Sequence, residues 1–86
     1  MTFQQLSFVV EVANCESINK AAERLYTSQS NVSNSIKALE DELGIKIFDR
    51  TKKGISVTEP GREFLSYARE ILDKMDFVED LSLIHI

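Results

Sequence analysis

The 86-residue sequence predicts a mainly α-helical single domain, with three helices and a short β-hairpin before one long final helix. Apolar residues recur at helical spacing in four segments, and two β-prone runs flank a turn that contains glycine. With 3 Gly, 1 Pro and 1 Cys, the chain is neither loop-rich nor closed by an internal disulfide. A small helical domain with a hairpin is therefore the expected architecture.

The first two expected helices are short. Residues 3–13 carry an apolar stripe at i, i+3, i+4 and i+7 behind Thr2, a suitable N-cap. The second helix follows Ser17, another N-cap residue, and ends at a break formed by Tyr26 and Thr27.

The third helix has the clearest pattern. Ser28 is the expected N-cap, and Gly44 follows the helix as a left-handed C-terminal residue. The apolar residues between them are spaced at i, i+4, i+7 and i+11, and they are Val32, Ile36, Leu39 and Leu43.

A hairpin and the long helix complete the chain. Residues 45–50 and 55–58 are the predicted strands, with residues 51–54 as the turn. Thr58 caps the last helix, where Glu59 and Pro60 are favoured in the first turn and Gly61 is only tolerated.

The last helix is predicted over residues 59–80, about 33 Å at 1.5 Å per residue. Phe64 and Leu65 are expected to pack on their own domain, which cannot cover the whole length. The remaining apolar residues recur at about 3.5 residues, which is typical of helices that pair with a second copy. The expected dimer interface is Ala68, Ile71, Leu72, Met75 and Val78.

Charge is unevenly distributed along the chain. The net charge of −4 would by itself argue against a nucleic-acid partner. However, residues 17–58 carry seven basic and five acidic side chains, whereas residues 59–86 carry three basic and seven acidic ones. Affinity for phosphates depends on the charge of the local surface. Because the middle of the chain is basic, the net charge does not exclude DNA as a partner.

The strongest functional signal is the pair of helices joined by a break of about three residues, which suits a helix-turn-helix. Small and amide side chains dominate the exposed face of the second of these helices, and such groups can contact base edges in the major groove. The alternative is that they are incidental polar residues. The candidate DNA-contacting residues on this helix are Ser28, Gln29, Ser30, Asn31, Ser33, Asn34 and Lys37.

A second signal is the hairpin tip, where Arg50, Lys52 and Lys53 place three cations in four residues. Such a turn could lie along the sugar-phosphate backbone as a wing. Taken alone, it could equally be a solubilising turn.

As a set, these residues resemble the N-terminal domain of LysR-type transcriptional regulators over residues 1–80. The resemblance rests on Ser17, Ala21, Ala22, Leu25, Ser28, Gln29, Val32, Ser33, Ile36, Leu39, Glu40, Leu43, Gly44, Phe48, Arg50, Thr58 and Gly61. It implies a winged helix-turn-helix over residues 1–58 and a linker and dimerisation helix over residues 59–80.

The resemblance also implies a homodimer that binds double-stranded DNA at an interrupted dyad, with Gln29 as the principal base reader. It implies a C-terminal domain, absent here, that binds a small-molecule effector, so no cofactor is expected in this chain. Many members have Arg where this chain has Asn34, and Pro or Ala near Ser30 and Asn31. Loss of an arginine–phosphate contact is expected to lower the salt slope of binding by about one unit.

The last six residues, 81–86, do not continue the heptad well and are expected to be a non-native or truncated tail. They could be the first strand of a following domain or the end of an engineered fragment. We favour a third interpretation: back-translated as CTG TCT CTT ATA CAC ATC, these residues match a transposon mosaic end used to prepare sequencing libraries, and the tail would then be a read-through artefact. His85 is therefore given no ligand role.

Other functions have weaker support. Cys15 lies beside Glu16 and lacks a resolving partner, and the run from Glu40 to Glu42 has no His or Cys nearby. The sequence contains no recognisable nucleophile–base pair and no phosphate-binding glycine loop, so an enzyme is not expected. No metal site is expected either. Without an export signal or an apolar run long enough for a membrane, a cytoplasmic location is expected. The alternative to DNA binding is a winged-helix module for protein interaction or dimerisation.

Overall fold

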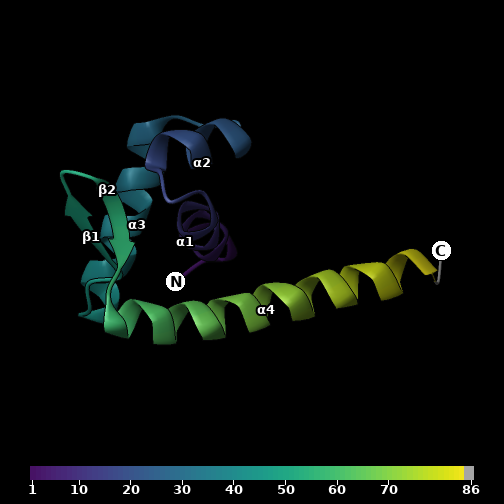
Figure 1. Cartoon of the computed structure of the whole chain (residues 1–86). Coiled ribbons are helices and arrows are strands. Elements are labelled where there is room, and N and C mark those ends of the chain that lie inside the picture. The colour runs from purple at the N-terminus through teal and green to yellow at the C-terminus, as the bar shows by residue number, and fades with distance from the viewer. Residues whose placement is uncertain (85–86) are drawn as a thin grey trace.

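The computed structural model describes residues 1–84 and confirms the expected mainly helical fold with a hairpin and a long last helix. Helices α1 (Phe3–Cys15), α2 (Ile18–Arg24) and α3 (Gln29–Leu43) gather into a compact head, with β1 and β2 at one side (Figure 1). Helix α4 (Glu59–Ile84) crosses below the head and then projects away from it, so the molecule is elongated, 49 × 25 × 20 Å.

Each short helix begins at a side chain that caps it, as the sequence predicts. Thr2 accepts the amide of Gln5 at 3.1 Å, while the Gln5 side chain accepts the amide of Thr2 at 2.9 Å, which completes a capping box. Ser17 accepts the amide of Lys20 at 3.2 Å. These caps satisfy backbone donors that would otherwise lack a partner, so they fix where each helix starts.

The core lies where the three helices of the head, the hairpin and the first turns of α4 meet. Its most completely buried large side chains come from α1, α3 and the segment before β1, and they are Val9, Val12, Val32, Leu39 and Ile47. Small residues at Ala21 and Ala22 are also buried, which allows α2 to approach its neighbours closely.

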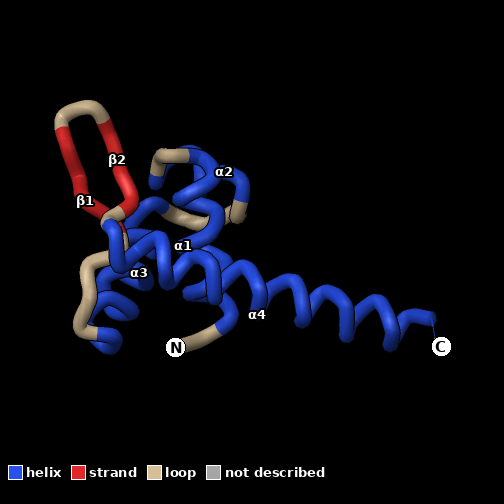
Figure 2. The backbone as a smooth tube through the Cα atoms, turned by 60° about the horizontal axis from the view of Figure 1, so that its bottom comes forward, coloured by secondary structure: helices blue, strands red, loops and turns tan. Residues whose placement is uncertain are grey.

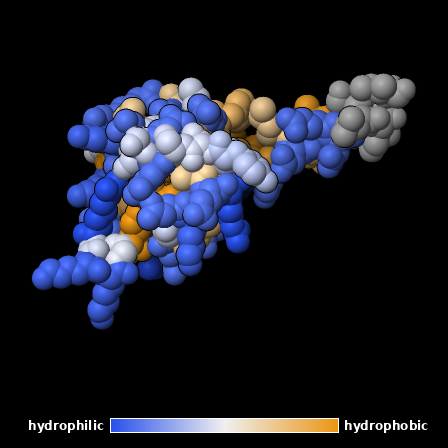
Figure 3. Space-filling view, turned by 90° about the horizontal axis from the view of Figure 1, so that it is seen from above, coloured by the Kyte–Doolittle hydropathy of each residue, from blue (hydrophilic) through white to orange (hydrophobic). Residues whose placement is uncertain are grey.

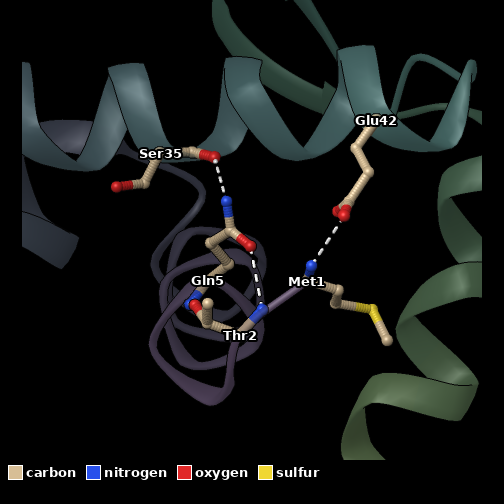
Figure 4. A network of polar contacts seen from close by, with 5 residues as sticks. All are labelled: Met1, Thr2, Gln5, Ser35 and Glu42. Atoms are coloured by element: carbon tan, nitrogen blue, oxygen red, sulfur yellow. Dashed lines mark hydrogen bonds and ion pairs between the residues drawn. The ribbon is translucent and has the colours of Figure 1, made fainter.

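A polar network joins the start of α1 to α3 (Figure 4). The N-terminal amine pairs with a carboxylate oxygen of Glu42 at 2.8 Å. The Gln5 amide also donates to the carbonyl oxygen of Ser35 at 3.5 Å. The ion pair is exposed and is therefore expected to add little to stability, whereas the hydrogen bond from Gln5 is partly buried.

The hairpin is shorter and tighter than the sequence predicts. Strand β1 (Phe48–Thr51) pairs antiparallel with β2 (Gly54–Val57), so only Lys52 and Lys53 form the turn (Figure 2). Residues 45–47 are not in a strand. This segment is bonded to the end of α3 instead, since the amide of Ile45 donates to the carbonyl oxygen of Glu40 at 3.3 Å and the Glu40 carboxylate accepts the amides of Ile47 at 2.7 Å and Phe48 at 3.3 Å.

The contact of Glu40 with these two amides gives a stability prediction. Glu40→Ala would leave partly buried N–H groups without an acceptor, at an expected cost of about 1–3 kcal/mol. Glu40→Gln retains an acceptor oxygen and is expected to cost less. Urea denaturation of both variants checks this, with the exposed Asp41→Ala as a control expected within about 0.5 kcal/mol of the parent. Equal stability of Glu40→Ala and the parent would contradict the structural role.

The start of α4 corrects the expectation that Gly61 is merely tolerated. Thr58 caps the helix as predicted, accepting the amide of Gly61 at 3.0 Å. Gly61 is buried, and a Cβ built there would lie 2.2 Å from the carbonyl oxygen of Ile47. The close approach of α4 to the segment before β1 therefore requires glycine at this position.

The far end of α4 also differs from expectation. The helix continues to Ile84 rather than ending near Asp80. The interpretation of residues 81–86 as the start of a strand is therefore wrong for residues 81–84, while His85 and Ile86 lie outside the described residues. Within residues 1–84, no helix combines the length and apolarity needed to cross a membrane.

Candidate nucleic-acid interface

The turn between α2 and α3 is tight and internally bonded. The amides of Leu25, Tyr26 and Thr27 donate to carbonyl oxygens of Ala21, Glu23 and Ala22, at 2.9, 3.2 and 3.0 Å. Tyr26 has φ of 55°, a left-handed conformation that is uncommon for a bulky residue, and its side chain is 96% exposed. Ser28 then caps α3, accepting the amide of Asn31 at 3.0 Å. These bonds fix the direction in which α3 leaves the turn.

Helix α3 divides cleanly into a buried and an exposed face. Val32, Ile36 and Leu39 face the core. Of the residues that the sequence singles out, Ser33 is half-buried, and the others on the helix are exposed: Gln29, Ser30, Asn31, Asn34 and Lys37. The structure therefore places an uncharged, hydrogen-bonding surface on the first two turns of α3, with one lysine beside it.

Some of these side chains are already engaged. The Ser28 oxygen caps the helix, and the Asn31 amide donates to the hydroxyl oxygen of Thr27 at 2.8 Å. In the part of the chain that the structure describes, the side chains of Gln29 and Asn34 make no hydrogen bond. Gln29 and Asn34 therefore have the fullest capacity to bind another molecule.

The three cations expected at the hairpin tip are divided between two places. Lys52 and Lys53 form the exposed turn, as predicted. Arg50 instead lies within β1, opposite Ile55, and its Nη2 donates to the Ser33 hydroxyl oxygen at 2.6 Å. Sequence spacing could not reveal this contact, because it joins residues 17 positions apart on different elements.

A groove of about 1010 Å³ lies between α3 and the hairpin. Ser33, Asn34 and Lys37 line it from the helix, and Arg50 and Thr51 line it from β1. The space-filling view shows mainly hydrophilic residues over the head, around a hollow where hydrophobic ones are visible (Figure 3). The surface is mixed in charge, since the lining also includes Lys46 and the acidic residues Glu40, Asp41 and Asp49.

The residues expected at the dimer interface do not all reach the surface. Ala68 is 0% exposed within this chain, where α4 packs on α1, so its side chain is not available to a second copy. Ile71, Leu72 and Met75 are half-buried, and Val78 is 62% exposed. Three further apolar residues of α4 are exposed and are absent from the expected interface, and they are Tyr67, Phe77 and Leu81. Tyr67 and Leu81 lie at helical spacing from Ile71 and Val78, on the same side of α4, so the sequence pattern alone could have identified them.

The head also contains the one cysteine of the chain, Cys15. Partial burial, together with a 3.4 Å hydrogen bond from Sγ to the Glu11 carboxylate, raises the pKa of the Cys15 thiol. A raised pKa disfavours the thiolate, which is the reactive form. Among residues 1–84, no group of three or more His, Cys, Asp or Glu side chains could hold a metal ion.

Comparisons with known proteins agree with this architecture. Residues 3–62 match the family described as bacterial regulatory helix-turn-helix protein, lysR family. The chain is 45% identical over 76 residues to the HTH-type transcriptional regulator CysB of Haemophilus influenzae, a match that covers 86% of this chain and 24% of CysB. It is also 45% identical over 84 residues to the regulator cbl of Klebsiella aerogenes, covering 95% and 27% of the two chains. The chain thus spans about a quarter of the length of these relatives.

Solved structures are similar over nearly the whole chain. The crystal structure of a complex of the CbnR DBD with DNA superposes with a TM-score of 0.90 at 35% identity, covering 99% of this chain and 98% of that one. A complex of the BenM DBD with benA site 1 DNA superposes with a TM-score of 0.92 at 30% identity, covering 100% of both chains. The chain therefore belongs to the lysR family of bacterial regulatory helix-turn-helix proteins.

Proposed function

We propose that this chain is the DNA-binding part of a transcriptional regulator, with α3 in the major groove and the hairpin along the phosphate backbone. The observation that carries the proposal is the exposed, uncharged face on the first turns of α3 beside a lysine turn. Amide and hydroxyl groups can discriminate base edges, whereas lysines on a turn contact phosphates without regard to sequence. The similarity to CbnR and BenM structures that contain DNA supports the same assignment.

Individual residues have distinct roles in this proposal. Gln29 is the principal base reader, because its side chain is exposed and uncommitted. Ser30 and Asn34 add further exposed polar groups on the first two turns of α3, and the hydrogen of the Ser28 hydroxyl remains available for a phosphate. Lys37, Lys52 and Lys53 supply positive charge, while the acidic residues of α4 beyond Arg69 lie on the part of the helix that leaves the head.

We further propose that two copies associate through α4 and bind a dyad whose half-sites are separated. The support is an apolar side of α4 whose residues are half-buried or exposed in this chain, formed by Tyr67, Ile71, Met75, Val78 and Leu81. A helix that projects alone into water is marginal, and pairing with a second copy would bury these side chains. A small-molecule effector would bind in the rest of the regulator, outside this chain.

This proposal predicts a dependence on the dyad. The chain should select dyads from a pool of random duplexes, and it should bind the selected dyad at least about tenfold more tightly than a single half-site. Val78→Asp places a charge on the pairing surface and should remove that difference by lowering affinity for the dyad only. Gel-shift titration and sedimentation measure both effects.

The matched control is Glu79→Ala, which changes the charge of the neighbouring residue. It should leave the preference for the dyad unchanged. Equal affinity of the parent chain for dyad and half-site, with a monomer in sedimentation, would contradict pairing through α4. Failure to select any duplex would contradict DNA binding and favour a protein-interaction module.

A further inference from the structure

The contact between Arg50 and Ser33 joins the two parts of the candidate interface. Arg50 Nη2 donates to Ser33 Oγ at 2.6 Å, a short distance for a charge-assisted hydrogen bond. Over residues 1–84, it is the one hydrogen bond between side chains of α3 and the hairpin. Glu40, near the opposite end of α3, also reaches the hairpin, but it accepts the backbone amides of Ile47 and Phe48. The Arg50–Ser33 bond is therefore a specific link near the DNA-facing half of α3.

Both partners keep unused donors. A guanidinium has five N–H donors, so most remain available after one bond to Ser33. Because the Ser33 oxygen accepts that bond, the serine hydrogen is free to donate to another acceptor. Neither of the ion pairs in the described part of the chain involves Arg50, so its positive charge is not neutralised by a carboxylate there.

The position of Arg50 is also unusual among the basic residues. It lines the large groove beside Ser33, Asn34 and Lys37. It also borders a smaller hollow of about 240 Å³ that Gln29 lines. Arg50 is thus close to the start of α3, whereas Lys52 and Lys53 lie at the turn, one strand position or more beyond it.

Accordingly, we propose that Ser33 is a positioning residue for Arg50, and that the two side chains together bind a single backbone phosphate between α3 and the hairpin. This inference rests on the proposed DNA binding. Ser33 holds the guanidinium in place before DNA arrives, so less side-chain freedom is lost when the phosphate binds. Removing either side chain should therefore remove most of what the pair contributes to DNA affinity.

A double-mutant cycle on DNA affinity tests the pairing, with the selected dyad duplex as the probe. Arg50→Ala should weaken binding about tenfold or more, because it removes a charge-assisted phosphate contact. Ser33→Ala should cause a similar loss, and the double variant should bind little worse than Arg50→Ala alone. The matched control combines Ser33→Ala with Lys53→Ala. Because Lys53 does not bond to Ser33, the two fold-losses of affinity should multiply in that double variant.

The salt dependence separates this role from a merely structural one. Ser33→Ala changes no charge, yet it should lower the slope of log K against log salt by nearly the same amount as Arg50→Ala, up to about 0.9 for the one phosphate in each half-site. Ser33→Thr keeps the hydroxyl, so its DNA affinity and its salt slope should both lie close to those of the parent chain. Thermal unfolding should show that all variants remain folded.

Two results would overturn the inference. One is that the losses for Ser33→Ala and Arg50→Ala multiply, which would mean that the residues act independently. The other is that the loss for Arg50→Ala is confined to one base pair, which would indicate a base edge rather than a phosphate as the ligand. If the parent chain binds no duplex at all, the proposed function fails instead, and that outcome is distinct from both.

Discussion

Gly61→Ala is expected to destabilise the protein by about 3 kcal/mol or more, although Gly→Ala inside a helix ordinarily stabilises by about 1 kcal/mol. The sign is reversed because the added Cβ would lie 2.2 Å from the carbonyl oxygen of Ile47 and 2.9 Å from its carbonyl carbon. These are backbone atoms, so they cannot move aside as a flexible side chain would. The same carbonyl oxygen accepts the amide of Thr58 at 3.0 Å, and a shift would weaken that bond as well.

Thermal unfolding checks this expectation. For a domain of this size, a loss of about 3 kcal/mol corresponds to a fall in Tm of roughly 10 °C or more. Ser66→Ala is the matched control, because it introduces the same methyl side chain at an exposed position of the same helix. Its Tm should be unchanged or slightly raised. A Tm for Gly61→Ala at or above that of the parent would show that α4 does not approach the Ile47 backbone this closely.

Gln29→Ala is expected to weaken binding to the selected dyad by about 1–3 kcal/mol per half-site and to relax the preference at one base pair. The physical reason is that an exposed amide can form two hydrogen bonds with an adenine, and alanine can form none. Folding should be unaffected, since Gln29 is exposed and makes no side-chain hydrogen bond within residues 1–84.

Lys53→Ala is the contrasting variant for this experiment. Its exposed position in the turn predicts a phosphate contact, so its loss should weaken binding to all duplexes alike and lower the salt slope by about one unit per bound chain. Affinities for the dyad and for duplexes altered at each position compare the two variants. A uniform loss for Gln29→Ala, or none, would contradict its role as base reader.

Local chemistry explains which features could be predicted from sequence. The caps at Thr2, Ser17, Ser28 and Thr58 were all predicted, because a cap depends on residues three positions apart. The exposed face of α3 was predictable for a similar reason, since the apolar stripe through Val32 and Leu39 fixes which side turns inward.

Contacts between distant elements explain what the sequence could not show. The requirement for glycine at position 61 depends on where the Ile47 carbonyl lies, and the link between Arg50 and Ser33 depends on how the hairpin leans on α3. The burial of Ala68 likewise depends on α1, which packs along the first turns of α4. A periodic stripe identifies an apolar face of a helix, but it does not say how far the domain's own core covers it.

The decisive measurement for DNA binding is the affinity of the unmodified chain for duplex DNA across salt concentrations. Fluorescence anisotropy would compare the selected dyad with a shuffled duplex of the same length between about 50 and 200 mM salt. We expect about a thousandfold preference for the dyad and a steep loss of affinity for both duplexes as salt rises. No binding at the lowest salt, or equal and salt-independent binding to both, would contradict this expectation.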